Sequence, residues 1–437
     1  MRKRYLYLYP LLIVASVMGL LYTATPKAHA ALAGEENGPI IYIDNPDSQD
    51  PNSVLTSQAD GTPNDLPAAT STDLITAATI SDPTTSNNYD IVYATVTPVT
   101  EDPPTVDCGL TNPVSTCAVL NKVTVDNNGL PIPTINEPFV LETLLVDGDD
   151  DDRGTNNWVP SLSYSPDGKL VLLTQFAFNN STEDDASALL IFNSVTNKVG
   201  TPIVSSNNFN YCLNGGYAQN GAIYYTSCPG ELGGSLYYVA PGETEGTPLV
   251  LQGDFVPKYP FFIDVSPDSS QILIANFGMD DCIYNLIVLY SNVGSAGNCD
   301  YYYVSTLDGT SKLISQLSYN STYKIEEDFV PTFFSPDGKF IIGTVYPVDN
   351  FTFGKSSVDK TIPYTAAFSR TNFSLTALTN TIGVQEWAPA IAVAPSIATT
   401  VLPTLPSTGA NSNVIFALAL ILIALGASTL VKAKQNN

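Results

Sequence analysis

A ten-residue segment recurs along the chain, and no other feature restricts the possible folds as strongly. The segment Ser165–Thr174 reads SPDGKLVLLT, and its best copy, Ser335–Thr344, reads SPDGKFIIGT. A weaker copy starts at Ser266 and a degenerate one at Ala218. Counted at the position of the motif's proline, five copies fall at 166, 219, 267, 336 and 395, separated by 53, 48, 69 and 59 residues. Units of roughly 40–50 residues with loop insertions are typical of repeats that each form one small sheet.

The SPDG tetrapeptide has the chemistry of a tight turn between two strands. Proline fixes φ at the first corner, aspartate caps the turn through its side chain, and glycine adopts the left-handed conformation. The apolar run that follows it, such as residues 170–174, predicts the next strand. We therefore favour a structural role for the motif, with ligand binding as the alternative.

The rest of the central region is rich in β-forming residues. Short runs of Val, Ile, Leu, Tyr and Phe alternate with Gly, Asn, Asp and Pro turns, and no long stretch outside the two ends shows helical periodicity. Trp158 precedes the first copy of the motif, and Trp387 precedes a truncated copy at Ala394-Pro395-Ser396. Both tryptophans are therefore predicted at the same position of the repeat.

This pattern resembles the WD40-like repeat of TolB-type β-propellers, whose blades carry a Trp, then SPDGK, then an apolar strand. The resemblance implies an all-β fold, a β-propeller of about five to six blades. The last copy lacks its later strands, and in propellers the N-terminal chain can supply them and close the ring. Ile40–Ile43 and Ile91–Val96 are the candidates. We expect the propeller over 91–396, after a flexible Ser/Thr/Asp/Pro-rich arm over 31–90 that is able to contribute a closing strand.

The N-terminus has the three parts of a secretory signal peptide. Basic residues at 2–4 are followed by an apolar run to about Leu21 and by a small-x-small site at Ala28-His29-Ala30. We expect a signal helix over 1–30 that is cleaved after Ala30, with an uncleaved anchor helix as the alternative. Cleavage removes the single His of the chain. The mature protein would then lack Ser-His-Asp and Cys-His nucleophiles and imidazole metal ligands.

The C-terminus carries a second targeting signal. After a short stalk over 397–404, Leu405-Pro406-Ser407-Thr408-Gly409 leads into an apolar run over 414–431 and two lysines. The run is long enough to cross a bilayer as a transmembrane helix, and the lysines favour a cytoplasmic end. The order of these parts resembles the LPxTG sorting signal of sortase-anchored surface proteins, with an ordinary tail-anchor helix as the alternative. The resemblance implies that sortase cleaves after Thr408 and joins its carboxyl to peptidoglycan on a Gram-positive-type cell, so that the precursor spans the membrane only transiently.

Processing at both ends leaves a strongly acidic protein. Six of the 17 basic residues and none of the 42 acidic residues lie in the removed ends, so the span 31–408 has a formal net charge of −31. Such a chain repels nucleic acid and anionic membrane surfaces. It is able to attract divalent cations or basic partners.

All six cysteines lie between the two targeting signals, which favours disulfides in an exported chain. Neighbours in the sequence are 9, 16 and 17 residues apart, and each pair brackets a plausible loop or hairpin. Free buried thiols are the alternative, and the absence of CxxC spacing argues against a metal site. The favoured pairs are Cys108–Cys117, Cys212–Cys228 and Cys282–Cys299.

The acidic run over 147–152 is the densest cluster of charge. The alternating residues Asp147, Asp149 and Asp151 have the oxygen ligands that Ca²⁺ prefers. The run departs from the EF-hand loop, which requires Gly at its sixth position, where this chain has Asp152. A solvated loop between blades is the simpler interpretation, and Ca²⁺ is the one cofactor that the sequence suggests.

No Gly-x-Ser-x-Gly elbow, P-loop or dinucleotide-binding fingerprint occurs in the chain. The sequence therefore predicts a wall-anchored propeller that acts as a non-catalytic binding module, adhesin- or receptor-like, for a protein or glycan. One alternative is an extracellular carboxylate-dependent hydrolase or lyase, which a pair of carboxylates in a central pocket would favour. The other is a structural wall component, and the fold alone does not choose among these functions.

Overall fold

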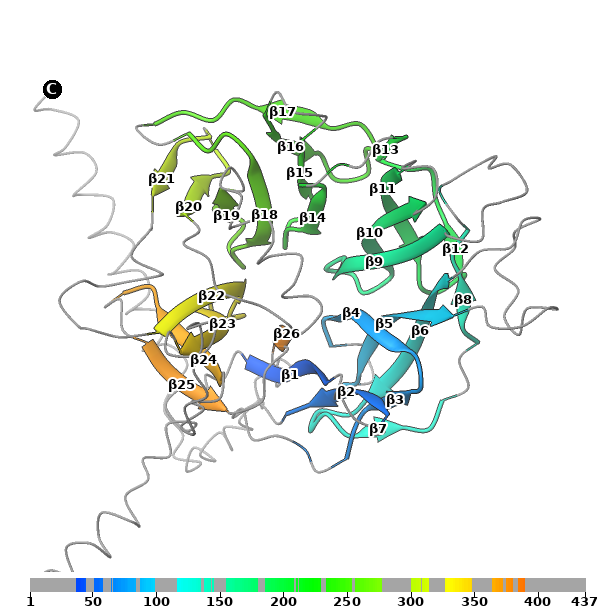
Figure 1. The fold of residues 1–437 in the computed structure, drawn as a ribbon. Helices are drawn as coiled ribbons and strands as arrows, with labels where there is room; N and C mark the ends of the chain where they lie inside the picture. Colours follow the sequence, from blue (N-terminus) through cyan, green and yellow to red (C-terminus); the bar gives the residue numbers. More distant parts are fainter. Residues whose placement is uncertain are drawn as a thin grey trace, which may run out of the picture. The chain divides into compact units, whose positions relative to one another are not determined.

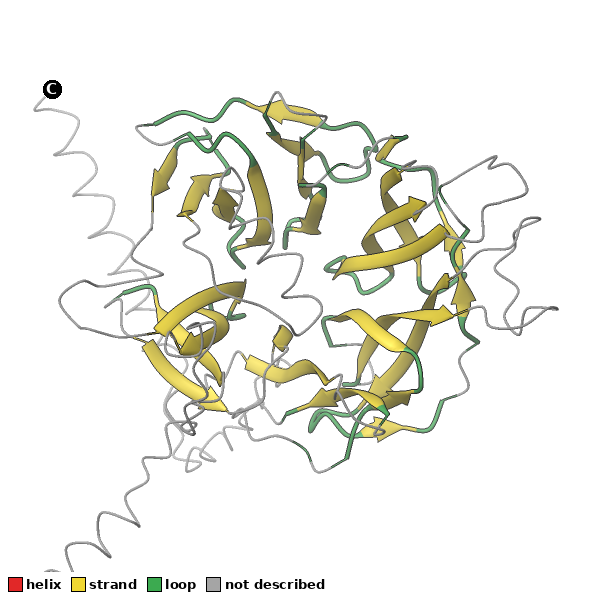
Figure 2. Ribbon diagram, in the orientation of Figure 1, coloured by secondary structure: helices red, strands yellow, loops and turns green. Residues whose placement is uncertain are grey.

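The computed structural model describes residues 37–389 apart from 45–50, 58–63, 65, 84–86, 99–115, 135–136, 143, 145–154, 180–184, 208–209, 211, 229–232, 254–255, 277–299, 308, 314–326, 348–363, 372–374 and 380–383. All regular elements in these residues are strands (Figures 1 and 2). None of the described residues forms a helix suited to crossing a bilayer. The predicted signal helix and the apolar run over 414–431 lie outside the described residues.

The strands form six separate antiparallel sheets, here called blades 1 to 6. Blade 1 contains β4 (Leu74–Ile80), β5 (Tyr89–Pro98), β6 (Thr116–Val125), β7 (Pro131–Ile132) and β8 (Phe139–Val140). Blade 2 contains β9 (Thr155–Tyr164), β10 (Leu170–Asn179), β11 (Asp185–Asn193), β12 (Lys198–Val199) and β13 (Val204–Ser206). Blade 3 contains β14 (Asn214–Tyr217), β15 (Ile223–Ser227), β16 (Ser235–Val239) and β17 (Thr247–Leu249).

The other three blades have four strands each. Blade 4 contains β18 (Pro260–Val265), β19 (Gln271–Asn276), β20 (Asp300–Ser305) and β21 (Ser311–Leu313). Blade 5 contains β22 (Glu327–Phe334), β23 (Phe340–Pro347), β24 (Tyr364–Ser369) and β25 (Leu375–Thr379). Blade 6 contains β26 (Val384–Pro389), β1 (Asn37–Asp44), β2 (Asn52–Thr56) and β3 (Ala69–Ser71).

The six blades surround a common axis (Figure 1). The strands nearest the axis contact one another in sequence, from β4 to β9, β14, β18, β22 and β26, and β26 contacts β4 to complete the ring. The fold is therefore a six-bladed β-propeller, which agrees with the all-β class and the blade number expected from the repeat.

The two ends of the described chain close the ring together. In blade 6 the last strand, β26, pairs with β1, so that Glu386 lies opposite Ile41 and Pro389 opposite Asn37. The prediction that Ile40–Ile43 closes the ring is confirmed, whereas Ile91–Val96 is part of the second strand of blade 1. The prediction of a flexible arm over 31–90 is wrong for the strands in this range. Strands β1 to β4 lie there, and the propeller already begins at Asn37.

The SPDG turns have the geometry that their residues predict. Gly168 and Gly338 have φ angles of 68° and 66°, in the left-handed region that favours glycine. In the turn of blade 2, the Ser165 hydroxyl donates to Asp167 Oδ1 over 2.7 Å, and the same oxygen accepts the amide of Lys169 over 3.2 Å. These bonds join the first two strands of the blade, which supports the structural role assigned to the motif.

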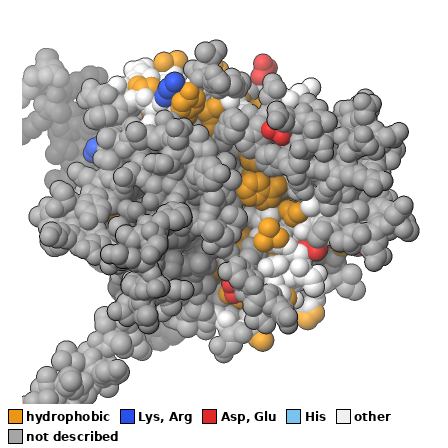
Figure 3. Space-filling model, viewed as in Figure 1, with side chains coloured by type: hydrophobic (Ala, Val, Ile, Leu, Met, Phe, Trp, Pro, Cys, Tyr) orange, Lys and Arg blue, Asp and Glu red, His pale blue; other side chains and the backbone are white. Residues whose placement is uncertain are grey.

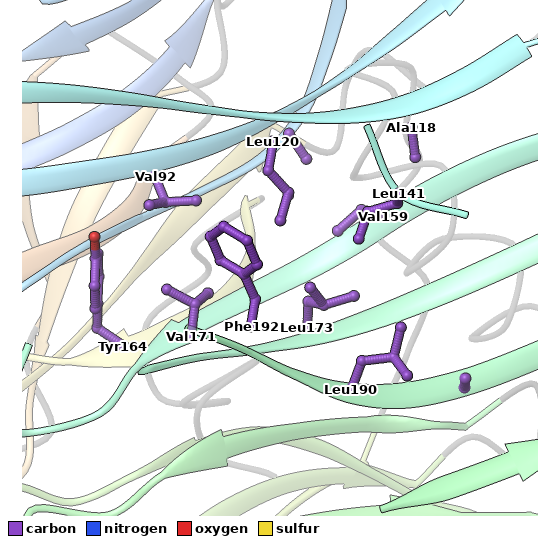
Figure 4. Packing of buried hydrophobic residues seen from close by; sticks show 12 residues of the cluster. Val92, Ala118, Leu120, Leu141, Val159, Tyr164, Val171, Leu173, Leu190 and Phe192 are labelled. Atoms are coloured by element: carbon purple, nitrogen blue, oxygen red, sulfur yellow. The ribbon is translucent and has the colours of Figure 1, made fainter. Parts of the chain in front are cut away.

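Apolar side chains fill the spaces between neighbouring blades. Figure 4 shows one such cluster, in which Val92 and Leu120 of blade 1 pack against Val171, Leu173 and Phe192 of blade 2. Each of these side chains is at most 5 % exposed. Because each blade has a face against the next one, burial of both faces depends on a closed ring.

A disulfide joins Cys212 and Cys228, as the sequence predicts. Cys212 precedes β14 and Cys228 follows β15, so the bond connects the two strands at the end opposite their turn. Both sulfurs pack against Gly234, where a Cβ atom would clash with Cys228 Sγ. Cys117 is also disulfide-bonded. Cys108, Cys282 and Cys299 lie outside the described residues, so the other two predicted pairings remain predictions.

Replacing Cys212 and Cys228 together by alanine is expected to lower the free energy of unfolding by about 3 kcal/mol, because an open chain gains entropy when a loop of this size is no longer closed. Urea denaturation of the oxidised protein and of the double variant measures the difference. An unchanged midpoint of unfolding would contradict this stabilising role of the disulfide.

Candidate functional site

A cavity of about 220 Å³ lies on the axis of the propeller and is lined by the inner strands of all six blades. These strands contribute carboxyl, hydroxyl and amide side chains, together with apolar residues and prolines. We call this cavity the axial pocket. On the face seen in Figure 3, the visible Lys and Arg side chains of the described residues lie toward the periphery.

The six inner strands each have one residue at the same structural position. We identify it from the residue that pairs with it in the second strand of the same blade. The six residues are three positions before the motif's proline or its counterpart, and we call them the belt positions. The pairs are Thr79 with Val92, Ser163 with Leu172, Gly216 with Tyr224, Asp264 with Leu273, Phe333 with Ile342 and Glu386 with Ile41.

Side chains at four belt positions accept a backbone amide from the next blade around the ring. Two of these acceptors are hydroxyls. Thr79 Oγ1 accepts a hydrogen bond from the amide of Tyr164 over 3.1 Å, and Ser163 Oγ accepts one from the amide of Tyr217 over 3.0 Å. Such bonds hold neighbouring inner strands in register.

The other two acceptors are carboxyls. Asp264 Oδ2 accepts the amide of Phe334 over 2.7 Å, and Asp264 Oδ1 accepts that of Val265 over 2.7 Å. Glu386 Oε2 accepts the amide of Ile80 over 2.9 Å and the hydroxyl of Thr79 over 2.6 Å. Glu386 therefore links the closing strand of blade 6 to the first strand of blade 1.

The remaining two belt positions have no acceptor in the side chain. At Gly216 a Cβ atom would lie 2.9 Å from the ring of Phe262, so the close approach of blade 4 requires glycine there. Phe333 is 4 % exposed and packs with Ile40 and Tyr42 of blade 6. Apolar packing replaces the hydrogen bond at this position.

The residues three positions after the belt positions form the mouth of the axial pocket. We call these residues the rim: Asp82, Pro166, Gln219, Pro267, Pro336 and Pro389. The Asp82 carboxylate accepts a hydrogen bond from Gln219 Nε2 over 3.2 Å, which connects blades 1 and 3 across the mouth. The prolines of the SPDG turns therefore also line the pocket, a location that the structural interpretation of the motif did not include.

Three carboxyls from three blades share this pocket, and the pKa of each is raised. Burial raises the pKa of Asp264 to about 7, although its bonds to the amides of Phe334 and Val265 oppose the shift. Burial likewise raises the pKa of Glu386 to about 8, and the negative charges of Asp264 and Asp82 add to this effect. At the rim, burial raises the pKa of Asp82 against the bond from Gln219.

No cation among the described residues balances these carboxyls. The ion pairs found there join Lys122 to Asp90, Lys169 to Asp167 and Lys339 to Asp337, all away from the pocket lining. The described part of the chain also has no group of three or more metal-ligating side chains placed to hold an ion. The site is thus an acidic pocket with a partly apolar rim.

The metal-binding and sorting residues proposed from the sequence lie outside the described residues. Asp147, Asp149 and Asp151 are outside the described residues, so calcium binding there remains a prediction. The pentapeptide over 405–409 is also outside them. Sequence reasoning missed the pocket carboxyls, although Asp264 had a usable signal because it lies three residues before Pro267 of a repeat copy.

Comparison with known proteins identifies the C-terminal signal. The model of the LPXTG cell wall anchor motif matches residues 398–437. The chain is therefore a surface protein of a Gram-positive-type bacterium that is anchored to the cell wall, and the motif implies processing by sortase and attachment to peptidoglycan. No curated protein sequence matches the chain.

The chain is similar, at low sequence identity, to several solved structures. A TolB from Agrobacterium tumefaciens is 16% identical, with a TM-score of 0.37 over 80% of this chain and 92% of that one. The periplasmic gluconolactonase of Pseudomonas aeruginosa is 10% identical, with a TM-score of 0.35 over 82% and 99% of the two chains. An acylaminoacyl peptidase from Pyrococcus horikoshii is 9% identical, with a TM-score of 0.39 over 77% and 46%. These proteins include enzymes, and similarity at this level does not transfer their activities.

Proposed function

We propose that this wall-anchored propeller is a binding protein whose ligand enters the axial pocket. The observation that carries the proposal is a cavity of about 220 Å³ where the inner strands of all six blades meet. A propeller holds such a pocket rigidly, because neighbouring inner strands are linked through the belt positions. Rigid, largely pre-formed pockets with a few convergent polar groups are typical of ligand sites.

The hydrogen bonds of the carboxyls support binding over catalysis. Both oxygens of Asp264 already accept backbone amides, so this carboxyl is engaged in holding strands together. A general acid or base must present its proton or lone pair to a substrate within hydrogen-bonding distance. Asp264 is poorly placed for that task.

A carboxylate-dependent hydrolase or lyase is the second candidate, and Glu386 is the residue that favours it. Burial raises the pKa of Glu386 to about 8, so its carboxyl is largely protonated at neutral pH, as a general acid must be. Its Oε2 bonds the first strand of blade 1, and Oε1 has no hydrogen-bond partner among the described residues. Turnover of a polysaccharide that is lost in Glu386→Gln would select this function over binding.

A ligand panel with a blocked variant tests the proposed function. Gln219 is an exposed rim residue, and Gln219→Trp is expected to cover the mouth and reduce binding at least tenfold. Thr196→Trp, at an exposed site in blade 2 away from the pocket lining, is the matched control and should bind normally. The panel contains glycans, amines and peptides, each applied with and without Ca²⁺. If no ligand bound by the mature protein responds to Gln219→Trp, the pocket is not the binding site.

A further inference from the structure

We propose that the axial pocket recognises a primary ammonium group on a short aliphatic chain, the chemistry of a lysine side chain. This inference rests on the proposed function, because it names the class of ligand for the same pocket. It follows from the charges in the pocket, from the equivalence of the belt positions and from the composition of the rim.

The first step concerns charge. Asp82, Asp264 and Glu386 come from three blades, and none of the described residues that line the pocket is Lys or Arg. Besides burial, the negative charges of Asp82 and Asp264 raise the pKa of Glu386, so ionisation of either aspartate disfavours ionisation of the glutamate. A cation that enters the pocket reverses this repulsion, because an opposite charge nearby favours the ionised form of a carboxyl.

The second step compares equivalent positions of the ring. Thr79 and Ser163 make the bond to the next blade with a hydroxyl, at positions equivalent to Glu386 and Asp264. A hydroxyl satisfies a backbone amide without the free-energy cost of burying a carboxylate. The carboxyls at Asp264 and Glu386 are therefore not needed for the bonds between blades. The property that distinguishes them from hydroxyls is that they become negatively charged when they ionise.

The third step concerns shape. Water occupies about 30 Å³ per molecule in the liquid, so a pocket of this size holds a group equivalent to roughly seven waters. Four of the six rim residues are prolines, which suit contact with methylene groups. An ammonium group donates three hydrogen bonds from one compact centre. It can enter between the prolines and lie among the belt carboxyls, with its aliphatic stem at the rim.

Calorimetric titration of the mature protein at pH 8.5 and low salt tests this inference. The probes are Nα-acetyl-lysine amide and its Nε-acetylated derivative, which has the same stem without the charge. We expect the first probe to bind and acetylation of its amine to weaken binding at least thirtyfold. Glu386→Gln and Asp264→Asn should each weaken binding of the charged probe at least tenfold. Glu245→Gln removes one exposed carboxyl outside the pocket and should leave the affinity unchanged.

Three results would overturn the inference. They are equal binding of the two probes, equal loss of affinity in Glu245→Gln and in the pocket variants, and failure of the charged probe to bind. A neutral or guanidinium ligand whose binding is abolished by Gln219→Trp would refute the ammonium class while leaving the proposed function intact. Absence of any ligand sensitive to Gln219→Trp would instead refute the proposed function itself.

Discussion

Replacing Glu386 by glutamine is expected to make the protein more stable at pH 8.5 and to leave its stability almost unchanged at pH 4.5. Burial raises the pKa of this carboxyl from 4.5 to about 8 in the folded protein. Between these two values the folded state keeps a proton that the unfolded state has lost. The free energy of unfolding of the native protein therefore falls as the pH rises through this range. Glutamine has no proton to lose, so the variant escapes this decline.

The expected difference at pH 8.5 is on the order of 2–3 kcal/mol, because the partial exposure of the carboxyl to the pocket reduces the full effect of such a pKa shift. Glutamine is a suitable replacement because its carbonyl oxygen is able to accept the bonds from Thr79 and Ile80. Urea denaturation at intervals between pH 4.5 and 9 measures the effect. Glu245→Gln, at an exposed site, serves as the control for a lost negative charge. A difference independent of pH would show that the pKa of Glu386 is the same in the folded and the unfolded protein.

Truncating Ile41 to alanine is expected to lower the free energy of unfolding by about 2–5 kcal/mol, because a fully buried side chain leaves a cavity. Ile41 is 0% exposed and lies opposite Glu386 in the closing pair of strands. It packs in one cluster with Ile75 and Ile91 of blade 1. Its loss therefore weakens the contact between the last blade and the first, on which closure of the ring depends.

Two further variants keep this prediction testable if Ile41→Ala fails to fold. Ile41→Val should cost only about 1 kcal/mol, since it removes a single methylene group. Leu66→Ala, at a side chain that is 63% exposed, should change the stability by less than about 0.5 kcal/mol. Denaturation midpoints and rates of protease digestion measure the series. Equal stability of the alanine variants at 41 and 66 would contradict the importance of the closing strand.

The parts of the fold that could be predicted are those that depend on residues close together in the sequence. The SPDG turns form because serine, aspartate and glycine satisfy one another within a few positions. The Cys212–Cys228 bond likewise closes a short segment. The altered copies at Ala218 and Ser266 also form turns between the first two strands of their blades. The turn of blade 1 was not recognised in the sequence. Blade 1 has Ser81-Asp82 in place of Ser-Pro, and its turn is longer, with the amide of Ser81 bonded to the carbonyl of Asp90.

The pocket could not be derived in the same way, because its carboxyls meet only after the ring has closed. Asp264 and Glu386 are more than a hundred residues apart in the chain. The repeat pattern also predicted the wrong register for the last blade, because it placed Trp387 at the position equivalent to Trp158. In the structure Trp387 directly follows the belt position, whereas Trp158 precedes Ser163 by five residues. The pairing of β1 with β26 decides this register.

The order of the closing strands has a mechanical consequence for a protein tethered by its tail. The chain that leaves β26 after Pro389 leads, through the last residues, to the covalent link expected at Thr408. Any pull on that link therefore enters the propeller through its innermost, ring-closing strand. The pair Asn37–Pro389 lies at the loaded end of the β1–β26 ladder and is therefore the first pair to bear the tension. Glu386, three residues further in, connects this strand to blade 1 and shares the strain.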